Sequence, residues 1–492
     1  MLVVQTMFQR RSLLLAWSAF LLIVFVLFNS CASHREQTET GRYLAKGTWT
    51  VSPALLVRVL RTLGTDDGDM ARYLAYSQAV LGRPYQSYYI RSMEEWRQDA
   101  SRFETGKDIN DPLESPPATP PRPLTPYRDF SVEYPPGFFL FALPPALLIS
   151  HGNLDQYSLI FGCYMGLLLC ASLWLSVRSA RLIAPELSGA RLVMWSALCL
   201  LALGPITLRR YDAVVSLSLC LLIYSCLSRR ALLAGIGLAI GVVAKGLPIL
   251  LVPLPVMYYA ANRRWRELAV ATTSGLIFGL LIGLPFAAWA GPQLFDLFRY
   301  HGGRPIQIES TAGALLVLSR LLPHQEISAV FTFGSLNLAG PGEPLLRSVA
   351  SVLPMMSLLA VWLGAFVAFR RAPDQTTRDR SLIVASCLIL VGQMALGKVF
   401  SPQYLTWLLP LGLLACLFVD ARGRWLVLVA MGLTPIIFPI FYDLSLPATV
   451  SPIFGLVVLV RNLCLLGWAL LLLVSFCRSF RVQTESAGAA AT

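Results

Sequence analysis

The chain has 492 residues, of which 56% are hydrophobic and only 14% are charged, and its mean hydropathy is +0.63. Roughly a quarter of the residues of a soluble domain are charged, so this composition excludes an ordinary water-soluble protein of this length. The formal net charge is +13, but many basic residues stand in short connections between apolar runs rather than in one patch. We therefore exclude a nucleic-acid-binding protein and expect a polytopic membrane protein surrounded by membrane lipids.

The first apolar run, residues 13–28, follows the pair Arg10-Arg11. Its length is marginal both for a cleaved signal peptide and for a membrane span. No small-residue cleavage site follows it cleanly, and the residues up to Cys31 match a lipoprotein processing site poorly. We favour an uncleaved first span, with a signal peptide as the alternative.

Further apolar runs predict an all-α protein of about 12 transmembrane helices. The run at 138–149 is too short to cross a hydrocarbon core that needs roughly 17–25 helical residues, so we expect an interfacial helix there. Beyond the first run, the spans are expected near 158–177, 192–208, 213–227, 231–245, 247–261, 267–290, 347–369, 381–397, 403–419, 425–441 and 452–476.

Charge in the short connections sets the predicted orientation. With the N-terminus in the cytoplasm, every short basic connection lies on the cytoplasmic side, as the positive-inside rule requires. A full crossing by 138–149 would turn all of these connections outward. They are 178–191, 228–230, 262–266, 370–380 and 420–424.

We accordingly predict one transmembrane domain over residues 1–492, in the inner cell membrane, with both termini cytoplasmic. Residues 29–137 form a first external loop with interfacial helices and a proline-rich insertion. Residues 291–346 form a second large external loop, and residues 478–492 form a short cytoplasmic tail. The proline-rich stretch at 114–126 is expected to be extended or mobile.

Carboxylates precede a predicted amphipathic helix at residues 70–81 in the first external loop. One aspartate before a helix is a normal N-cap, but this turn offers Asp66, Asp67 and Asp69. Three carboxylates are more than an N-cap needs, so a catalytic or binding role is the alternative to capping. The helix also carries Tyr73. An Asp-x-Asp pair can bind a divalent cation without having to do so, so a cation is possible, but we assign no metal ligand and no certain cofactor.

Polar and aromatic residues begin or end several other external segments. Glu133 and Tyr134 precede two prolines that fix the backbone, although a tyrosine at headgroup level is also an ordinary interfacial residue. His301 and Glu309 lie in a glycine-containing loop that could close over a substrate. Gln403 and Tyr404 open a span from the outer face.

Cations recur at the predicted outer ends of spans. A lysine at mid-membrane costs roughly 2.5–3.5 kcal/mol, and Lys245 interrupts an otherwise uncharged stretch, so it is expected to snorkel or to be functional. Several cations at one membrane level suit an anionic lipid headgroup. The set comprises Lys245, Arg210, Arg304 and Lys398, with Asp212 beside Arg210 and with Arg461 deeper in its span. All of these groups except Arg461 are predicted on one face, which favours a cleft between the external loops and the outer leaflet.

Short motifs in this order resemble the C-type superfamily of membrane glycosyltransferases, and more narrowly glycosyltransferase family 87, which includes polyprenol-phosphate-mannose-dependent mannosyltransferases. Each motif is weak alone, and together they spread from about residue 64 to residue 410. They are Asp69-x-x-x-Tyr73 with Gly82-x-Pro-Tyr85, Tyr134-Pro-Pro, Arg210-Tyr-Asp212, Gly241-x-x-x-Lys245, Arg304-Pro-Ile-Gln-Ile-Glu309 and Ser401-Pro-Gln-Tyr404.

The resemblance implies a polyprenyl-phosphate sugar donor, with mannose or another hexose or pentose, and a glycan or glycolipid acceptor. It also implies a catalytic aspartate in the first external loop, which falls on Asp69, with Asp67 as the alternative. We expect inversion at the anomeric carbon, with the aspartate as general base and with the cations on the leaving phosphate. The proline-rich insertion puts the acceptor site in doubt. The rival functions are a lipid or glycan flippase and an O-antigen-type polymerase or ligase.

Overall fold

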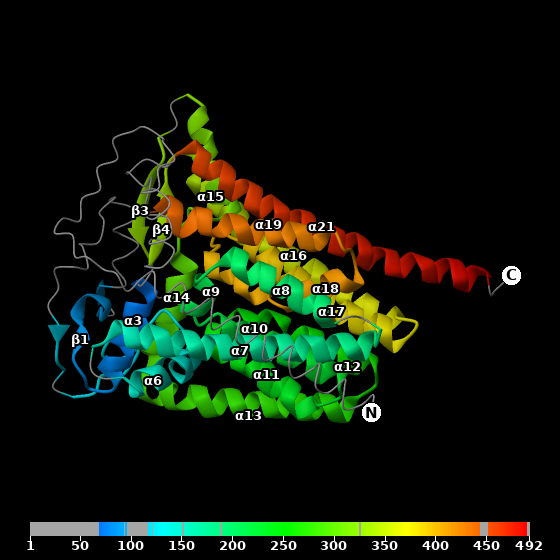
Figure 1. Cartoon of the computed structure of the whole chain (residues 1–492), viewed down its shortest axis with the longest axis horizontal. Helices are drawn as coiled ribbons and strands as arrows, with labels where there is room; N and C mark the ends of the chain where they lie inside the picture. Colours follow the sequence, from blue (N-terminus) through cyan, green and yellow to red (C-terminus); the bar gives the residue numbers. More distant parts are fainter. Residues whose placement is uncertain are drawn as a thin grey trace.

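Long helices run side by side along the molecule, and the shorter polar elements gather at one end (Figure 1). The computed structural model describes residues 68–92, 94–95, 117–120, 122–149, 152–186, 189–323, 326–442 and 451–489, with side chains described as far as 477. The predicted first span at 13–28 and Asp67 lie outside the described residues. In Figure 1 the polar end, with α3, β3 and β4, is on the left.

Six helical stretches among the described residues are long and apolar enough to cross a membrane. Apolar helices of 10–17 residues accompany them. The long ones are α7 (Leu154–Ile183), α13 with its continuation (Trp265–Gly303), α16 (Glu343–Arg371), α17 (Gln375–Leu396), α19 with its continuation (Gly423–Phe441) and α21, which crosses with Pro452–Cys477 and continues to Ala489. The protein is therefore an all-α polytopic membrane protein.

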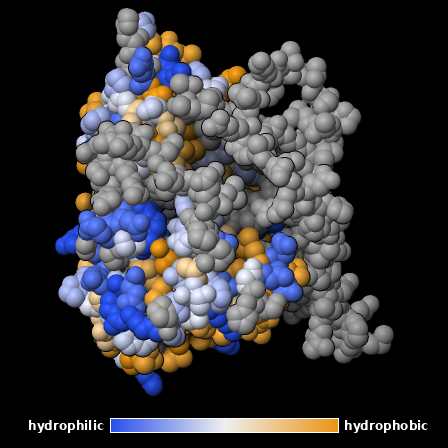
Figure 2. Space-filling model, turned by 90° about the vertical axis from the view of Figure 1, so that its left-hand side faces the viewer, coloured by the Kyte–Doolittle hydropathy of each residue, from blue (hydrophilic) through white to orange (hydrophobic). Residues whose placement is uncertain are grey.

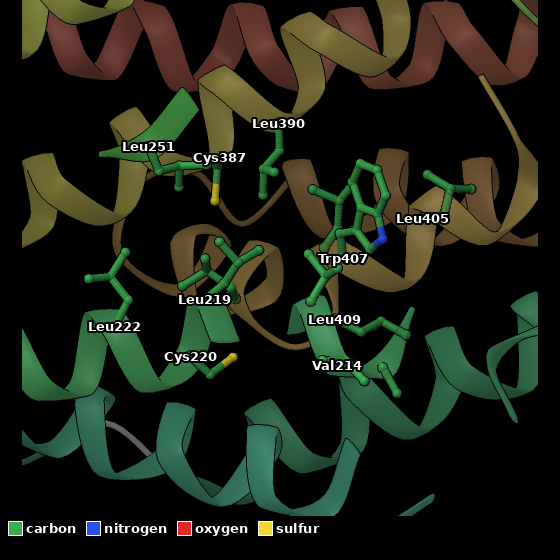
Figure 3. Close-up of a cluster of buried hydrophobic side chains, with 14 of the residues drawn as sticks. Val214, Leu219, Cys220, Leu222, Leu251, Cys387, Leu390, Leu405, Trp407 and Leu409 are labelled. Carbon is green, nitrogen blue, oxygen red and sulfur yellow. The ribbon is translucent and has the colours of Figure 1, made fainter. Parts of the chain in front are cut away.

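Two groups of helices share one core. In the first group, α10 (Ala213–Leu227) packs against α7 and α11 (Ala231–Lys245), and α11 packs against α13 (Trp265–Ala290). In the second group, α21 packs against both α17 and α19 (Gly423–Pro435). Figure 3 shows apolar side chains of α10, such as Leu219, facing those of α17, such as Leu390, where the groups meet.

Shorter helices complete the bundle. They are α8 (Gly189–Leu203), α9 (Ile206–Arg209), η4 (Leu247–Leu251), α12 (Pro253–Ala261), η5 (Gly291–Phe295), α14 (Asp296–Gly303), α15 (Thr311–Leu318), η6 (Ser319–Leu321), η7 (Pro402–Leu408), α18 (Leu411–Phe418) and η8 (Ile436–Phe441).

The polar end is built from short elements. Helix α3 (Gly68–Val80) packs against α6 (Phe139–Leu147), which follows η3 (Pro136–Phe138). Strand β1 (Tyr85–Gln86), before η1 (Ser87–Tyr89), pairs with β2 (Pro117–Ala118), so the proline-rich stretch is extended at these two residues. Strands β3 (Ser328–Thr332) and β4 (Ser335–Ala339) form an antiparallel hairpin.

The predicted spans beyond the first all fall on apolar helical segments, and the short run at 138–149 is a helix of only nine residues, as expected. The predicted span at 192–208 divides into α8 and α9 at Gly204, which has a φ of 73°. The predicted span at 403–419 is also wrong as a continuous helix. It divides into η7 and α18 because Pro410 has no amide hydrogen to donate and its ring disfavours continuation of the helix. The hairpin of β3 and β4 was not expected from the sequence.

Candidate active site

A pocket of about 560 Å³ opens at the polar end of the bundle. Its walls come from α3, the segment before η3, the C-terminal end of α11, α14, the turn between β3 and β4, and η7. On the described part of this face, patches of hydrophilic side chains lie beside hydrophobic ones (Figure 2). Eight residues predicted from the sequence line the pocket: Asp69, Glu133, Tyr134, Lys245, His301, Arg304, Gln403 and Tyr404.

Two carboxylates and an arginine form one wall. Asp69 lies in the first turn of α3, and Arg72 follows one turn later on the same face of the helix. The guanidinium of Arg72 forms ion pairs with Glu133 and, at 3.4 Å, with Asp69. The Tyr76 hydroxyl donates to Glu133 at 2.6 Å, and Arg210 Nε lies 2.7 Å from Asp69 Oδ2.

Both carboxylates are ionised in this arrangement. Burial alone raises the pKa of Asp69, but the positive charges of Arg210, Arg72 and Lys245 outweigh burial and hold that pKa below its ordinary value. Burial also raises the pKa of Glu133, and the charge of Arg72 with its hydrogen bond and that of Tyr76 lowers it below the ordinary value. The wall therefore presents acceptors of hydrogen bonds at neutral pH.

The segment Tyr134-Pro135-Pro136-Gly137 lies directly against the end of α11. A Cβ atom on Gly137 would stand 2.7 Å from the backbone of Val243, so only glycine permits this approach. The ring of Tyr134 contacts the edge of the buried Tyr73 ring, with 5.6 Å between centroids. Tyr73 thus lies beneath the pocket wall and supports Tyr134.

Lys245 is the last residue of α11, where Gly246 ends the helix at a φ of 76°. Its Nζ lies 3.1 Å from Asp212 Oδ2 and 4.2 Å from the centroid of the Tyr211 ring. Trp407 Nε1 donates to the other oxygen of Asp212 at 2.6 Å. Asp212 is fully buried, so it holds the lysine from below and leaves the pocket surface to the ammonium group.

Basic groups from the second large loop face this wall. Arg304 donates from Nη2 to Ser335 at 2.8 Å, and its buried Nε has no hydrogen-bond partner among the described residues. His301 Nε2 lies 3.0 Å from the Glu133 carbonyl oxygen. Lys398 stands beside the pocket without lining it, and its Nζ donates to the Gly302 carbonyl at 2.7 Å.

Glu309 lies behind the pocket and does not line it. Its side chain accepts a hydrogen bond from the Tyr442 hydroxyl at 2.6 Å, and its carbonyl accepts one from Arg461 at 2.6 Å. The buried Arg461, which was hard to explain from the sequence, thus ties α21 to the loop that carries Arg304. Burial raises the pKa of Glu309 to about 7, although Arg461 and the Tyr442 hydrogen bond lower it.

The family model described as glycosyltransferase family 87 matches residues 132–402, which is more than half of the chain. The chain belongs to glycosyltransferase family 87. It is therefore a membrane glycosyltransferase of the C-type superfamily, as the sequence motifs indicated. Asp69 lies outside the matched residues.

Among solved structures, this family 87 glycosyltransferase is similar to a crystal structure of ArnT from Cupriavidus metallidurans in the apo state. The sequence identity is 15% and the TM-score is 0.38, over 83% of this chain and 71% of that chain. No curated protein matches the chain.

Several side chains of the pocket in this family 87 glycosyltransferase were missed from the sequence. Arg72 could have been found, because it follows Asp69 by three residues and so shares its helix face. Tyr211 and Trp407 also line the pocket. Trp407 comes from a segment almost two hundred residues away from Asp212, and no local pattern joins the two. Chemically, the pocket brings ionised hydrogen-bond acceptors and cations together.

Proposed function

We propose that this glycosyltransferase transfers a sugar from a polyprenyl-phosphate carrier to a hydroxyl group of a glycan or glycolipid, on the extracytoplasmic face. The observation that carries the proposal is that one pocket is lined both by the ionised carboxylates Asp69 and Glu133 and by the cations Lys245 and Arg304. The carboxylates suit a hydroxyl acceptor. The cations suit a phosphate leaving group.

In the proposed reaction the acceptor oxygen attacks the anomeric carbon. The bond from that carbon to the phosphate oxygen breaks, and the lipid phosphate leaves with the electron pair. Asp69 takes the proton of the acceptor hydroxyl as general base. A single displacement of this kind inverts the anomeric configuration. Asp67 is the alternative base because the two aspartates are only two positions apart.

In this proposal the cations stabilise the negative charge that develops on the departing phosphate. Lys245 and Arg304 line the pocket, and Arg210 joins them from beside Asp69. Arg304 is well suited because its buried Nε lacks a hydrogen-bond partner among the described residues. Lys398 acts near the phosphate by fixing the Gly302 carbonyl and adding positive charge.

Some of the remaining predicted residues bind the sugars, and the others hold the binding residues in position. Tyr134 and Tyr404 offer ring faces, while Gln403, His301 and Glu133 offer hydrogen bonds to hydroxyl groups. Tyr73, Asp212 and Glu309 act from beneath the surface on Tyr134, on Lys245 and on the loop that carries Arg304. All of these groups belong to one transmembrane domain with its two large loops outside the cytoplasm.

The test supplies purified protein in lipid with a panel of polyprenyl-phosphate sugars and short glycan acceptors. The expected result is release of free lipid phosphate together with a glycosylated acceptor, both detected by mass spectrometry. Asp69→Asn protein, purified in equal amount, is the matched control and should release both products about 10²–10⁴-fold more slowly. Accumulation of donor inside vesicles without cleavage of the sugar–phosphate bond would instead support a flippase.

A further inference from the structure

The hairpin of β3 and β4 meets the polar pocket at its turn. Thr332 at the end of β3 pairs with Ser335 at the start of β4, so Phe333 and Gly334 make up the whole loop between the strands. Both of these loop residues line the pocket. The mechanism proposed above gives neither of them a role.

The backbone of this turn is strained. Phe333 has a φ of 52° and Gly334 has a φ of 64°. A two-residue hairpin loop with positive φ at both positions normally carries asparagine, aspartate or glycine. A bulky side chain at positive φ is a rare exception that costs free energy and persists only where the surroundings hold it. Such exceptions cluster at functional sites, and this one stands in the wall of the candidate active site.

Contacts with the rest of the protein hold the turn in this conformation. The Phe333 ring packs against the ring of Tyr300 on α14, with 5.1 Å between centroids. Asn337 is fully buried, and its Nδ2 donates hydrogen bonds to the Thr332 carbonyl at 2.6 Å and the Ser335 carbonyl at 3.1 Å. One amide group therefore joins both strands at the points where the loop begins and ends.

The hairpin fixes Arg304, which we assign to the donor phosphate. Arg304 Nη2 donates to Ser335 Oγ at 2.8 Å, and Ser335 comes directly after the loop. The backbone that follows Arg304 is also fixed, because the Leu338 amide of β4 donates to the Ile306 carbonyl at 2.9 Å. The place of this arginine thus depends on the hairpin through both its side chain and its backbone.

The same turn approaches Arg72. A Cβ atom on Gly334 would stand 3.3 Å from Arg72 Nη1, which is tighter than an ordinary van der Waals contact. This guanidinium pairs with Glu133 and Asp69. The turn therefore also supports the carboxylate wall that we assign to the acceptor.

We infer that the turn Phe333-Gly334-Ser335 is a positioning element that holds Arg72 and Arg304 in a fixed relation, and so aligns the acceptor hydroxyl with the departing phosphate. The inference rests on the proposed function and adds residues that act on both substrates without taking part in the chemistry. A rigid turn suits this role, because a misplacement of about 1 Å can cost about 10²-fold in rate.

Gly334→Ala tests the contact with Arg72. The new Cβ displaces the guanidinium from Glu133, so the acceptor KM should rise about fivefold or more while the donor KM stays the same. Gly342→Ala is the matched control, because Gly342 also has a positive φ, of 84°, but an added Cβ there meets nothing within 4 Å. Both variants should lose thermal stability through backbone strain, and the control should keep both KM values.

Ser335→Ala tests the contact with Arg304. Loss of one hydrogen bond from the guanidinium should raise the donor KM about threefold to tenfold and leave the acceptor KM unchanged. Ser335→Thr keeps a hydroxyl group at this position and should restore the donor KM. Initial rates of lipid-phosphate release are measured with one substrate varied and the other saturating.

The expected result is that two neighbouring substitutions affect different substrates. The inference is overturned by unchanged KM values, by equal rises of both KM values in Gly334→Ala and Ser335→Ala, or by a donor KM that Ser335→Thr does not restore. Should Gly334→Ala not fold, the Ser335 variants decide alone. In each of these cases the unaltered enzyme still releases lipid phosphate, so the proposed function stands. No release by the unaltered enzyme from any lipid-phosphate sugar would remove the proposed function, and this inference with it.

Discussion

Arg210 Nε lies 2.7 Å from Asp69 Oδ2, so a cation that we assign to the donor phosphate already holds the carboxylate that we assign to the acceptor hydroxyl. A phosphate that binds Arg210 competes with Asp69 for the same guanidinium. It also brings negative charge close to the carboxylate. Both effects raise the pKa of Asp69, and a higher pKa makes a carboxylate a stronger base. Donor binding and activation of the base are therefore coupled.

The coupling predicts different pH profiles for the free enzyme and its donor complex. In the free enzyme Arg210, Arg72 and Lys245 outweigh burial and keep the Asp69 pKa below its ordinary value. The acid limb of kcat should thus lie at higher pH than the acid limb of kcat/KM for the donor, both measured at saturating acceptor. In Arg210→Gln protein the acid limbs of kcat and kcat/KM should lie closer to the same pH. Coincident limbs in the unaltered enzyme would contradict the coupling.

Asp69→Asn should lower kcat by about 10²–10⁴-fold, because an amide cannot accept the acceptor proton. Membrane abundance should stay normal. Initial rates with donor and acceptor saturating are the measurement.

Two further variants separate the candidate bases. Asp67→Asn should retain most activity, whereas Glu133→Gln should raise the acceptor KM more than it lowers kcat. A larger loss in Asp67→Asn than in Asp69→Asn would transfer the role of base to Asp67.

Lys245→Met should raise the donor KM by about tenfold or more, because a charge-assisted contact to phosphate is lost. It should also destabilise the protein by about 3 kcal/mol, since Asp212 is left buried without its cation. The double variant with Asp212→Asn removes both charges. It should recover most of the thermal stability and keep the raised donor KM. Recovery of both properties would mean that Lys245 only balances Asp212.

The sequence predicted most of this fold because apolar length and loop charge are local properties. The helices α10 and α11 begin and end at the predicted residues. A helix was predicted over 70–81, and α3 covers Gly68–Val80, so Asp69 lies inside its first turn rather than before it. The break at Pro410 and the hairpin of β3 and β4 were missed, since hydropathy averages over the proline and a five-residue strand gives little signal.

The candidate site was predictable at the level of residue types and less so at the level of partners. Asp69 and Lys245 stood out as charges in unusual places. Their partners come from distant segments: Arg210 for Asp69 and Asp212 for Lys245. Glu309 resembled a pocket residue in sequence but lies behind the wall, because Tyr442 and Arg461 reach it from the end of the chain.

Glu309→Gln should change how stability depends on pH. The ordinary pKa of the side chain is 4.5, and burial raises it to about 7 in the folded protein, although Arg461, the Tyr442 hydroxyl, Arg304 and Arg210 lower it. The folded state then holds the proton more tightly than the unfolded state. Its contribution to stability is complete below pH 4.5 and is lost as the pH rises through 7. The glutamine of the variant does not titrate. Its melting temperature should therefore decline less than that of the unaltered protein between pH 4.5 and about pH 7.

Asp129→Asn is the matched control for that measurement. Burial raises the pKa of Asp129, but hydrogen bonds from Arg122 and the Thr125 amide outweigh burial and lower it to about 2. Its titration ends below the range in which Glu309 titrates. The pH dependence of Asp129→Asn protein above pH 4.5 should therefore match that of the unaltered protein. A Glu309→Gln curve parallel to the unaltered one would show that Glu309 carries its charge throughout.

The orientation of the bundle predicts which ends of the helices react with a membrane-impermeant thiol reagent. Thr119 is exposed at the polar end beside β2, and Pro373 is exposed in the three-residue turn between α16 and α17. Arginines in the helix ends on both sides of that turn should hold it in the cytoplasm. In a variant without reactive native cysteines, Thr119→Cys should be labelled on intact cells, and Pro373→Cys only after permeabilisation. The reverse pattern would place the pocket with Asp69 and Lys245 in the cytoplasm, where an outer-leaflet donor could not reach it.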